Sequence, residues 1–268
     1  MNKVISLVNS DRTLVRWSTF IVSLLLGAAI WEAVGMSFNQ AFMAPLFGNE
    51  EHPGTLPRLY VYFFDDEEYL LSLGQSIRLF STGFVLALLV AIPLGIIMAR
   101  LITLRIALET YVLALYVTPM IALIPFILSI LGFDFWPKVL VVFLFAFFPI
   151  LYNTLEGARS VKPELIEVAR SFRSTEFAIW RDILVPYTLP YALTGIRQAS
   201  GRALVGMVAA ELFLSTSGLG EELITASRNF DMAGVLATIL VITGLGITFM
   251  RIAQSVEKKY SAWRGVDR

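Results

Sequence analysis

The chain of 268 residues has no cysteine and a single histidine, His52. The lack of cysteine excludes disulfides, thiolate metal sites and cysteine nucleophiles, and it leaves histidine chemistry to one residue in a loop between acidic residues and Pro53-Gly54. Charge is also scarce: 16% of the residues are charged, against roughly 25% in soluble domains. The 21 basic and 21 acidic residues cancel, so no nucleic-acid partner is indicated.

The common catalytic motifs are missing as well. No lysine follows a glycine, which excludes the phosphate-binding loop of many ATPases. One histidine cannot form H-E-x-x-H, and the G-x-S-x-G turn of many hydrolases does not occur. We therefore predict no catalytic residue, no metal site and no cofactor bound by this chain.

Apolar residues are abundant and lie in long runs. They make up 57% of the chain, and the mean hydropathy is +0.72, which indicates a membrane protein. A bilayer span needs about 20 apolar residues, and helices satisfy every backbone group internally. We expect the first run to be a retained helix, because it is too long for a signal peptide. The predicted fold class is an all-α polytopic membrane protein with six transmembrane helices, at residues 17–36, 79–99, 110–133, 139–155, 183–210 and 232–250.

The basic residues of the connecting segments predict the orientation, since cytoplasmic segments are rich in Lys and Arg. With the N-terminus inside, the inside segments hold fifteen basic residues and the outside segments three, Arg58, Lys138 and Arg228. The first outside segment is instead acidic, including Glu50, Glu51 and residues 65–68. We predict a multi-pass protein of the cytoplasmic (inner) membrane, in contact with membrane lipid and with both termini cytoplasmic.

Three regions follow from these predictions. Residues 1–70 hold the cytoplasmic N-terminus, the first span and an outside segment with a loop and a short helix. Residues 71–256 hold the other five spans, and residues 257–268 form a cytoplasmic tail. Within the second region, residues 156–186 form a long cytoplasmic excursion, and loops of such length are usually functional or structured.

The excursion has the pattern of two short helices. Pro163 suits the first turn of a helix and Glu164 complements its dipole, while Ser174 or Thr175 can cap a second helix. Pro186 is expected to break that helix before the fifth span. The first helix has an apolar side and a charged side. The apolar side holds Leu165, Ile166, Val168, Ala169 and Phe172, and the charged side holds Glu164, Glu167 and Arg170. The hairpin either connects two spans or docks a cytoplasmic partner.

This excursion resembles the EAA loop of ABC importer permeases. The family pattern is E-A-A, three residues, Gly, nine residues, Ile, one residue, Leu-Pro. The chain has Glu167-Val168-Ala169, then Arg173, Ile183 and Val185-Pro186 at the same spacing. Flanking stretches such as 193–197, 201–204, 210–213 and 217–220 resemble the nitrate/sulfonate/taurine subgroup, and the resemblance extends over residues 70–255.

The resemblance implies a type I ABC importer permease-like fold with a cytoplasmic coupling loop. It implies as partners an ATP-binding subunit, which would hold ATP and Mg, a second permease copy, most simply identical, and an extracytoplasmic solute-binding protein. The loop's first helix would insert into a groove of the ATP-binding subunit, with polar contacts around Glu167 and an apolar plug from Ala169 and Phe172. The implied coupling residues are Glu164, Glu167, Val168, Ala169, Arg170, Phe172, Arg173, Ile183 and Pro186.

Arg173 departs from the family pattern, which has a glycine at the sharp turn. A non-glycine residue with positive φ is uncommon. Either the turn in this chain has ordinary φ, or an acidic partner holds Arg173.

Several residues inside the spans are candidates for the translocation pathway or its gate. Arg197 and Arg202 lie about 140° apart around the fifth helix, so they face different surroundings. Intramembrane arginines are costly, and either structure and gating or contact with an anionic solute accounts for them. Glu211 can pair with an arginine or reach the headgroups. Pro119 and Pro125 fit either a curved helix that lines the pathway or a plain kink.

The function predicted from the resemblance is transport of a small anionic solute, coupled to ATP hydrolysis by a partner chain. Sulfonate, taurine, nitrate, bicarbonate, aromatic and pyrimidine solutes all stay open. The alternative is a secondary transporter driven by an ion gradient, but no inverted repeat or mid-span acidic residue favours it.

Overall fold

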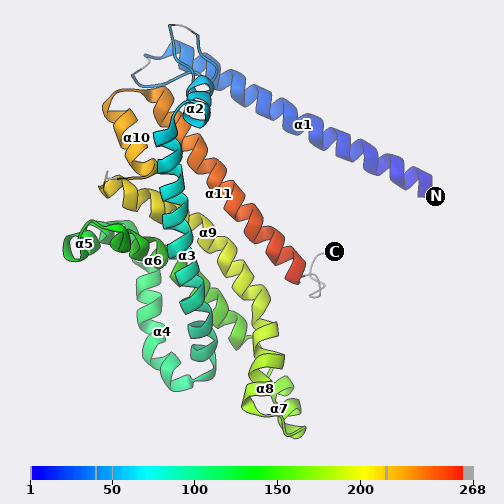
Figure 1. Ribbon diagram of the computed structural model, residues 1–268. Helices are drawn as coiled ribbons and strands as arrows, with labels where there is room; N and C mark the ends of the chain where they lie inside the picture. Colours follow the sequence, from blue (N-terminus) through cyan, green and yellow to red (C-terminus); the bar gives the residue numbers. More distant parts are fainter. Residues whose placement is uncertain (1, 40, 50, 215–216, 262–268) are drawn as a thin grey trace. The chain divides into compact units, whose positions relative to one another are not determined.

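The computed structural model describes residues 2–39, 41–49, 51–214 and 217–261. Glu50 and residues 262–268 of the predicted tail lie outside the described residues, as do the side chains of Lys3 and Arg12. Within the described part every regular element is a helix, which confirms the all-α prediction (Figure 1). In chain order they are α1 Asn2–Ser37, α2 Thr55–Phe64, α3 Glu67–Arg100, α4 Ile102–Val117, α5 Met120–Leu131, α6 Phe135–Arg159, α7 Pro163–Ser171, α8 Glu176–Ile179, the π-helical turn η1 Trp180–Leu184, α9 Val185–Leu214, α10 Leu219–Arg228 and α11 Met232–Ser261.

Four segments of the described chain are long and apolar enough to cross a membrane as single helices: Val15–Ser37, Glu67–Arg100, Phe135–Arg159 and Met232–Tyr260. The pair α4 and α5 supplies a fifth span if the two helices are taken together. Helix α9, which covers most of the fifth predicted span, carries two arginines and a glutamate among its 30 residues. The total of six spans therefore stays a prediction.

The third predicted span, 110–133, is not one continuous helix. Helix α4 ends at Val117, α5 begins at Met120, and the two axes are bent by 101° (Figure 1). The break falls at Thr118-Pro119, where both residues have extended backbone angles. A residue before proline avoids the helical region and proline lacks an N–H, so the helix ends at this dipeptide. The prediction of a curve or kink at Pro119 within one helix was therefore wrong.

The chain divides into two compact units. The first comprises Met1–Leu70 and Glu222–Leu240. In it the carboxylate of Glu32 on α1 accepts hydrogen bonds from the backbone N–H groups of Phe47 (2.8 Å) and Gly48 (3.2 Å). This carboxylate thus anchors the segment that leads to α2.

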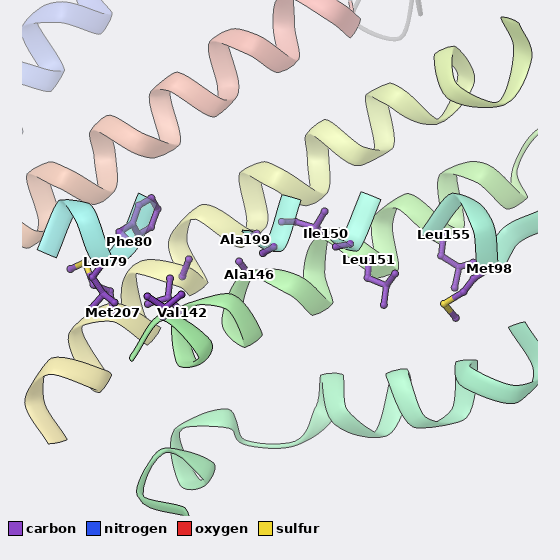
Figure 2. Close-up of a cluster of buried hydrophobic side chains, with 14 residues drawn as sticks. Leu79, Phe80, Met98, Val142, Ala146, Ile150, Leu151, Leu155, Ala199 and Met207 are labelled. Carbon is purple, nitrogen blue, oxygen red and sulfur yellow. The ribbon is translucent and has the colours of Figure 1, made fainter. Parts of the chain in front are cut away.

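The second unit comprises Leu71–Glu221 and Val241–Arg268. Its core lies between α3, α6 and α9, and Figure 2 shows the apolar side chains of these helices facing one another. Close approach of α6 and α9 depends on small residues. Ala199 and Ala203 are fully buried, and a Cβ added to Gly206 would lie 2.7 Å from the ring of Phe145. Small residues at a helix contact let the two backbones approach closely.

Candidate functional site

Helix α7, the first helix of the cytoplasmic excursion, has a well-defined start and end. Pro163 occupies its first turn and Glu164 lies at the positive end of the helix dipole, as predicted. At the other end the N–H of Ser174 donates to the carbonyl of Ala169 (3.0 Å), and the N–H of Arg173 donates to that of Arg170 (2.8 Å). This pair of bonds is a Schellman motif, which needs a left-handed residue directly after the cap.

Arg173 is that left-handed residue, with φ of 55°. One of the two alternatives for this position, an ordinary φ, is therefore excluded. The glycine of the family pattern and Arg173 occupy the same turn, and the turn forms without glycine. Among the described residues no carboxylate lies within ion-pair distance of Arg173. The left-handed conformation costs Arg173 about 1–2 kcal/mol. The backbone hydrogen bonds of the motif offset this cost.

The second half of the hairpin is held by one capping threonine and one glutamate. The N–H of Ala178 donates to Oγ1 of Thr175 (3.2 Å), so Thr175, not Ser174, caps α8. Glu176 accepts hydrogen bonds from Arg100 at the end of α3 (2.6 Å) and from Arg170 of α7 (3.2 Å). These two guanidinium groups lower the pKa of Glu176 below its ordinary value. One carboxylate thus connects α3, α7 and α8.

The apolar residues of α7 divide between two surroundings. Ile166 and Ala169 pack against a cluster of Val161, Ile179 and Leu184 within the chain. The remaining three are exposed: Leu165 (43%), Val168 (55%) and Phe172 (81%). Ala169 thus packs partly against its own chain, and its place in an apolar plug with Phe172 stays a prediction. The charged residues Glu164, Glu167 and Arg170 of the same helix are exposed as well.

Helix α8 continues into the next long helix without a break. The π-helical turn η1 joins α8 to α9, and the N–H of Val185 donates to the carbonyl of Trp180 five residues earlier. Pro186 lies in the first turn of α9, and Ile183 packs against the Val161–Ile179–Leu184 cluster. The prediction that Pro186 breaks the helix was wrong, since the π turn accommodates the hydrogen bond that proline cannot make. Helices α8 and α9 therefore follow one another without a break in the ribbon (Figure 1).

Two of the pathway candidates meet at the bend between α4 and α5. A cavity of about 290 Å³ there contains Pro119 of the bend and Arg202 of α9 in its wall. The guanidinium of Arg202 lies over the ring of Tyr116, 4.9 Å from its centroid. The cation is thus held by an aromatic face beside a cavity, where its N–H groups can receive an anion.

The other pathway candidates lie elsewhere in the second unit. Arg197 forms an ion pair with Glu257 (Nε to Oε2, 3.3 Å), and Thr194 donates to the same carboxylate (2.9 Å). The two arginines of α9 therefore have different surroundings, as their spacing predicted. Pro125 lies inside α5, where its carbonyl accepts from Ser129 (2.8 Å).

Glu211 is 1% exposed at the end of α9. It accepts from Oγ of Ser76 (2.7 Å) and from the N–H of Gly220 (3.0 Å), and Ser76 in turn accepts from the N–H of Leu219 (2.8 Å). Among the described residues no arginine lies within ion-pair distance of Glu211, and its side chain is buried. Its carboxylate instead holds the beginning of α10 against α3 and α9.

Sequence reasoning missed Tyr116, Glu176 and Ser76. Each acts on a residue far away in the chain, the separations being 86 residues for Tyr116 and Arg202, 76 for Arg100 and Glu176 and 135 for Ser76 and Glu211. A local signal existed only for Glu176, which follows the capping Thr175 in the first turn of α8.

Known transport proteins share much of this sequence. Residues 91–262 match the family of binding-protein-dependent transport system inner membrane components. A "Probable ABC transporter permease protein" of Brucella abortus is 32% identical over 189 residues, covering 70% of this chain and 76% of the relative. A formylaminopyrimidine transport permease protein of Halalkalibacterium halodurans is 30% identical over 242 residues (90% and 93%). A taurine transport system permease protein of Escherichia coli is 28% identical over 193 residues (72% and 70%). The chain therefore belongs to the binding-protein-dependent transport system inner membrane components and is a multi-pass ABC importer permease of the sulfonate/taurine subgroup.

Proposed function

We propose that this chain forms the translocation pathway for a small anionic solute and couples its passage to ATP hydrolysis in a separate subunit through α7. The observation that carries the proposal is the division of α7 into two faces. Ile166 and Ala169 fix the helix to its own chain, while Phe172, 81% exposed, and Val168 project from it. An exposed aromatic side chain with charges beside it suits a groove on a partner protein.

The contacts of the hairpin join α7 and α8 firmly to α3 and α9. Glu176 ties α7 and α8 to the end of α3, and η1 makes α8 continuous with α9. Displacement of Phe172 by a partner would therefore move α9 as one body. Because α9 carries Arg202 into the cavity at the α4–α5 bend, that cavity would open or close with the partner.

The assembly follows from this role. Two copies of the chain, two ATP-binding subunits and an extracytoplasmic solute-binding protein would form the transporter, with ATP and Mg bound by the ATP-binding subunits. This chain would bind no cofactor and catalyse no reaction. Both of its termini and α7 would be cytoplasmic, in keeping with the fifteen basic residues of the inside segments.

An anionic solute is favoured by the cation at the cavity. Arg202 is exposed there and lies over Tyr116, and no described carboxylate is within ion-pair distance of it. The named relatives carry taurine, which bears a sulfonate, and a formylaminopyrimidine. We therefore place sulfonate-, taurine- and nitrate-like solutes first among the candidates.

The coupling role is tested with Glu167→Lys in the reconstituted transporter. Reversing a charge beside Phe172 should abolish most of the ATPase activity stimulated by solute and binding protein, with the chain still inserted and dimeric. Glu68→Lys is the matched control, because Glu68 is also an exposed helical glutamate but lies at the other end of α3 from the coupling loop. Unchanged stimulated ATPase in Glu167→Lys would refute docking through α7.

A further inference from the structure

Helix α2 exposes an apolar face. Four of its exposed residues are spaced three and four positions apart and therefore share one side of the helix: Pro57, Tyr60, Val61 and Phe64. Tyr60 is 60% exposed and Phe64 is 72% exposed, and their rings stack with centroids 4.7 Å apart. A helix on the surface of a water-soluble domain has the opposite arrangement, with its apolar face turned toward the core. The exposed aromatic face of α2 therefore indicates surroundings other than water.

The polar groups of α2 are turned toward the protein. Arg58 forms an ion pair with Oδ2 of Asp231, and Oδ1 of the same carboxylate accepts from the N–H of Gly234 (3.0 Å) in the first turn of α11. Tyr62 is buried and stacks on Tyr69 of α3, with ring centroids 4.0 Å apart. The structure describes every residue of α2, and Arg58 is the only charged one. The charge of this helix is therefore already paired, and its exposed residues carry none.

The beginning of α2 is fixed to the end of a membrane span. In the candidate span Val15–Ser37, the indole N–H of Trp31 donates to the carbonyl of Ala44 (3.1 Å). The carbonyl of the next residue, Pro45, accepts from the N–H of Thr55 (2.9 Å), the first residue of α2. These hydrogen bonds connect the first turn of α2 to the last turns of α1. Because a span ends where the membrane ends, α2 begins near the membrane surface.

The other end of α2 and its ion pair also lie at span ends. Asp231, which pairs with α2, directly precedes the candidate span Met232–Tyr260, and two residues separate α2 from the candidate span Glu67–Arg100. Residues 65–68 are all acidic, and they stay in water because carboxylates are costly in hydrocarbon. Phe64 directly precedes them and therefore lies at the boundary between water and lipid.

The span to which α2 is attached is itself suited to contact with lipid. Within Val15–Ser37, 6% of the most apolar stretch is buried, and apolar side chains such as Leu24, Leu25 and Ile30 are exposed. Lipid that surrounds this span also reaches its end, where α2 is held. The amphipathic ring of a tyrosine such as Tyr60 is favoured at the level of the lipid headgroups.

We propose that α2 lies in the plane of the membrane surface, with Tyr60, Val61 and Phe64 inserted at the boundary between lipid headgroups and acyl chains. The partner of this face is the lipid bilayer. Interfacial helices bury their apolar face about 5–10 Å into this boundary. In this position α2 keeps the attached ends of α1 and α11 at a fixed depth. The proposal goes beyond the proposed function and does not depend on it, since it requires only that these helices span a membrane.

Site-directed spin labelling tests the proposal in the full chain, reconstituted in nanodiscs of phosphatidylcholine. The chain has no cysteine, so Tyr60→Cys and Phe64→Cys each accept one nitroxide label. Electron paramagnetic resonance then measures collision rates of the label with oxygen, which partitions into lipid, and with a water-soluble nickel chelate. Ser227→Cys, at an exposed polar residue of α10, is the control. We expect the ratio of the oxygen rate to the nickel rate to be roughly threefold higher or more at positions 60 and 64 than at position 227.

Other occupants of this face give different results. A face that stands in water to receive a solute-binding protein would let labels at positions 60 and 64 collide with nickel as often as the label at position 227, which overturns the proposal. A face covered by a second copy of the chain, or by another part of the same chain, would give low rates with both oxygen and nickel, and this result also overturns it. If one variant does not fold, the other carries the test, because both side chains are exposed.

Discussion

Arg173→Gly should stabilise the α7–α8 hairpin. Arg173 has φ of 55° after the cap of α7, a conformation that costs an L-residue about 1–2 kcal/mol and glycine almost nothing. Glycine also has more freedom in the unfolded chain, which offsets about 0.5–1 kcal/mol of this gain. The expected net stabilisation is therefore about 0.5–1 kcal/mol.

The effect is measured by hydrogen exchange at the N–H of Ser174, which donates to the carbonyl of Ala169. A gain of this size should slow its exchange about two- to fivefold if exchange follows local opening of the turn. Ser174→Gly is the neighbouring control: φ is not positive there, so glycine should destabilise the hairpin by about 0.5–1 kcal/mol. Phe230→Gly tests generality, because Phe230 (φ 57°) occupies the same position after α10.

Faster exchange in Arg173→Gly, or loss of assembly with the ATP-binding subunit, would refute the reasoning. Either result would mean that the side chain of Arg173 contributes more than its backbone conformation costs, as a contact with a partner would.

Three further predictions concern packing and charge. Gly206→Ala should destabilise the chain by about 1–3 kcal/mol, because the added methyl group overlaps Phe145. Gly201→Ala on the same helix is the control: an added Cβ there would lie 3.9 Å from its nearest neighbour, so thermal unfolding should show a neutral or stabilising effect. Glu211→Ala should lower the free energy of unfolding by about 2–4 kcal/mol, because it leaves the buried N–H of Gly220 and the hydroxyl of Ser76 without their acceptor. The control is Glu221→Ala, since Glu221 is less buried than Glu211. Equal unfolding midpoints of the two variants would contradict the prediction. Arg100 and Arg170 lower the pKa of Glu176, so the ionised carboxylate stabilises the hairpin. This stabilisation is complete above pH 4.5, the ordinary pKa of glutamate, and is lost as the pH falls through the lowered pKa of Glu176 in the folded chain. The protection factors of the α7 amides, which correct for the intrinsic slowing of exchange at low pH, should therefore fall on acidification in the native chain, and this response should be absent in Glu176→Gln.

Local chemistry made much of the coupling hairpin predictable. Pro163 and Thr175 specify where α7 and α8 begin, and each does so through a contact within its own turn. Such features need no knowledge of distant residues.

The features that could not be predicted depend on competition between local signals or on distant contacts. Pro119 and Pro186 are both prolines within apolar runs, yet the chain bends by 101° at the first and continues as a helix through the second. A π turn before Pro186 makes the difference, and no residue pattern specifies it. Glu211 acquires its role only when Ser76, 135 residues earlier, is brought beside it.

The central claim is that Phe172 on α7 enters the ATP-binding subunit, and site-directed cross-linking tests it most directly. The chain has no cysteine, so Phe172→Cys provides a single attachment point for a photoreactive maleimide in the assembled transporter. Phe230→Cys, also at an exposed phenylalanine, is the control. The account predicts a cross-link to the ATP-binding subunit from position 172 and none from position 230. No cross-link to that subunit from position 172, in a complex that still contains it, would contradict the account.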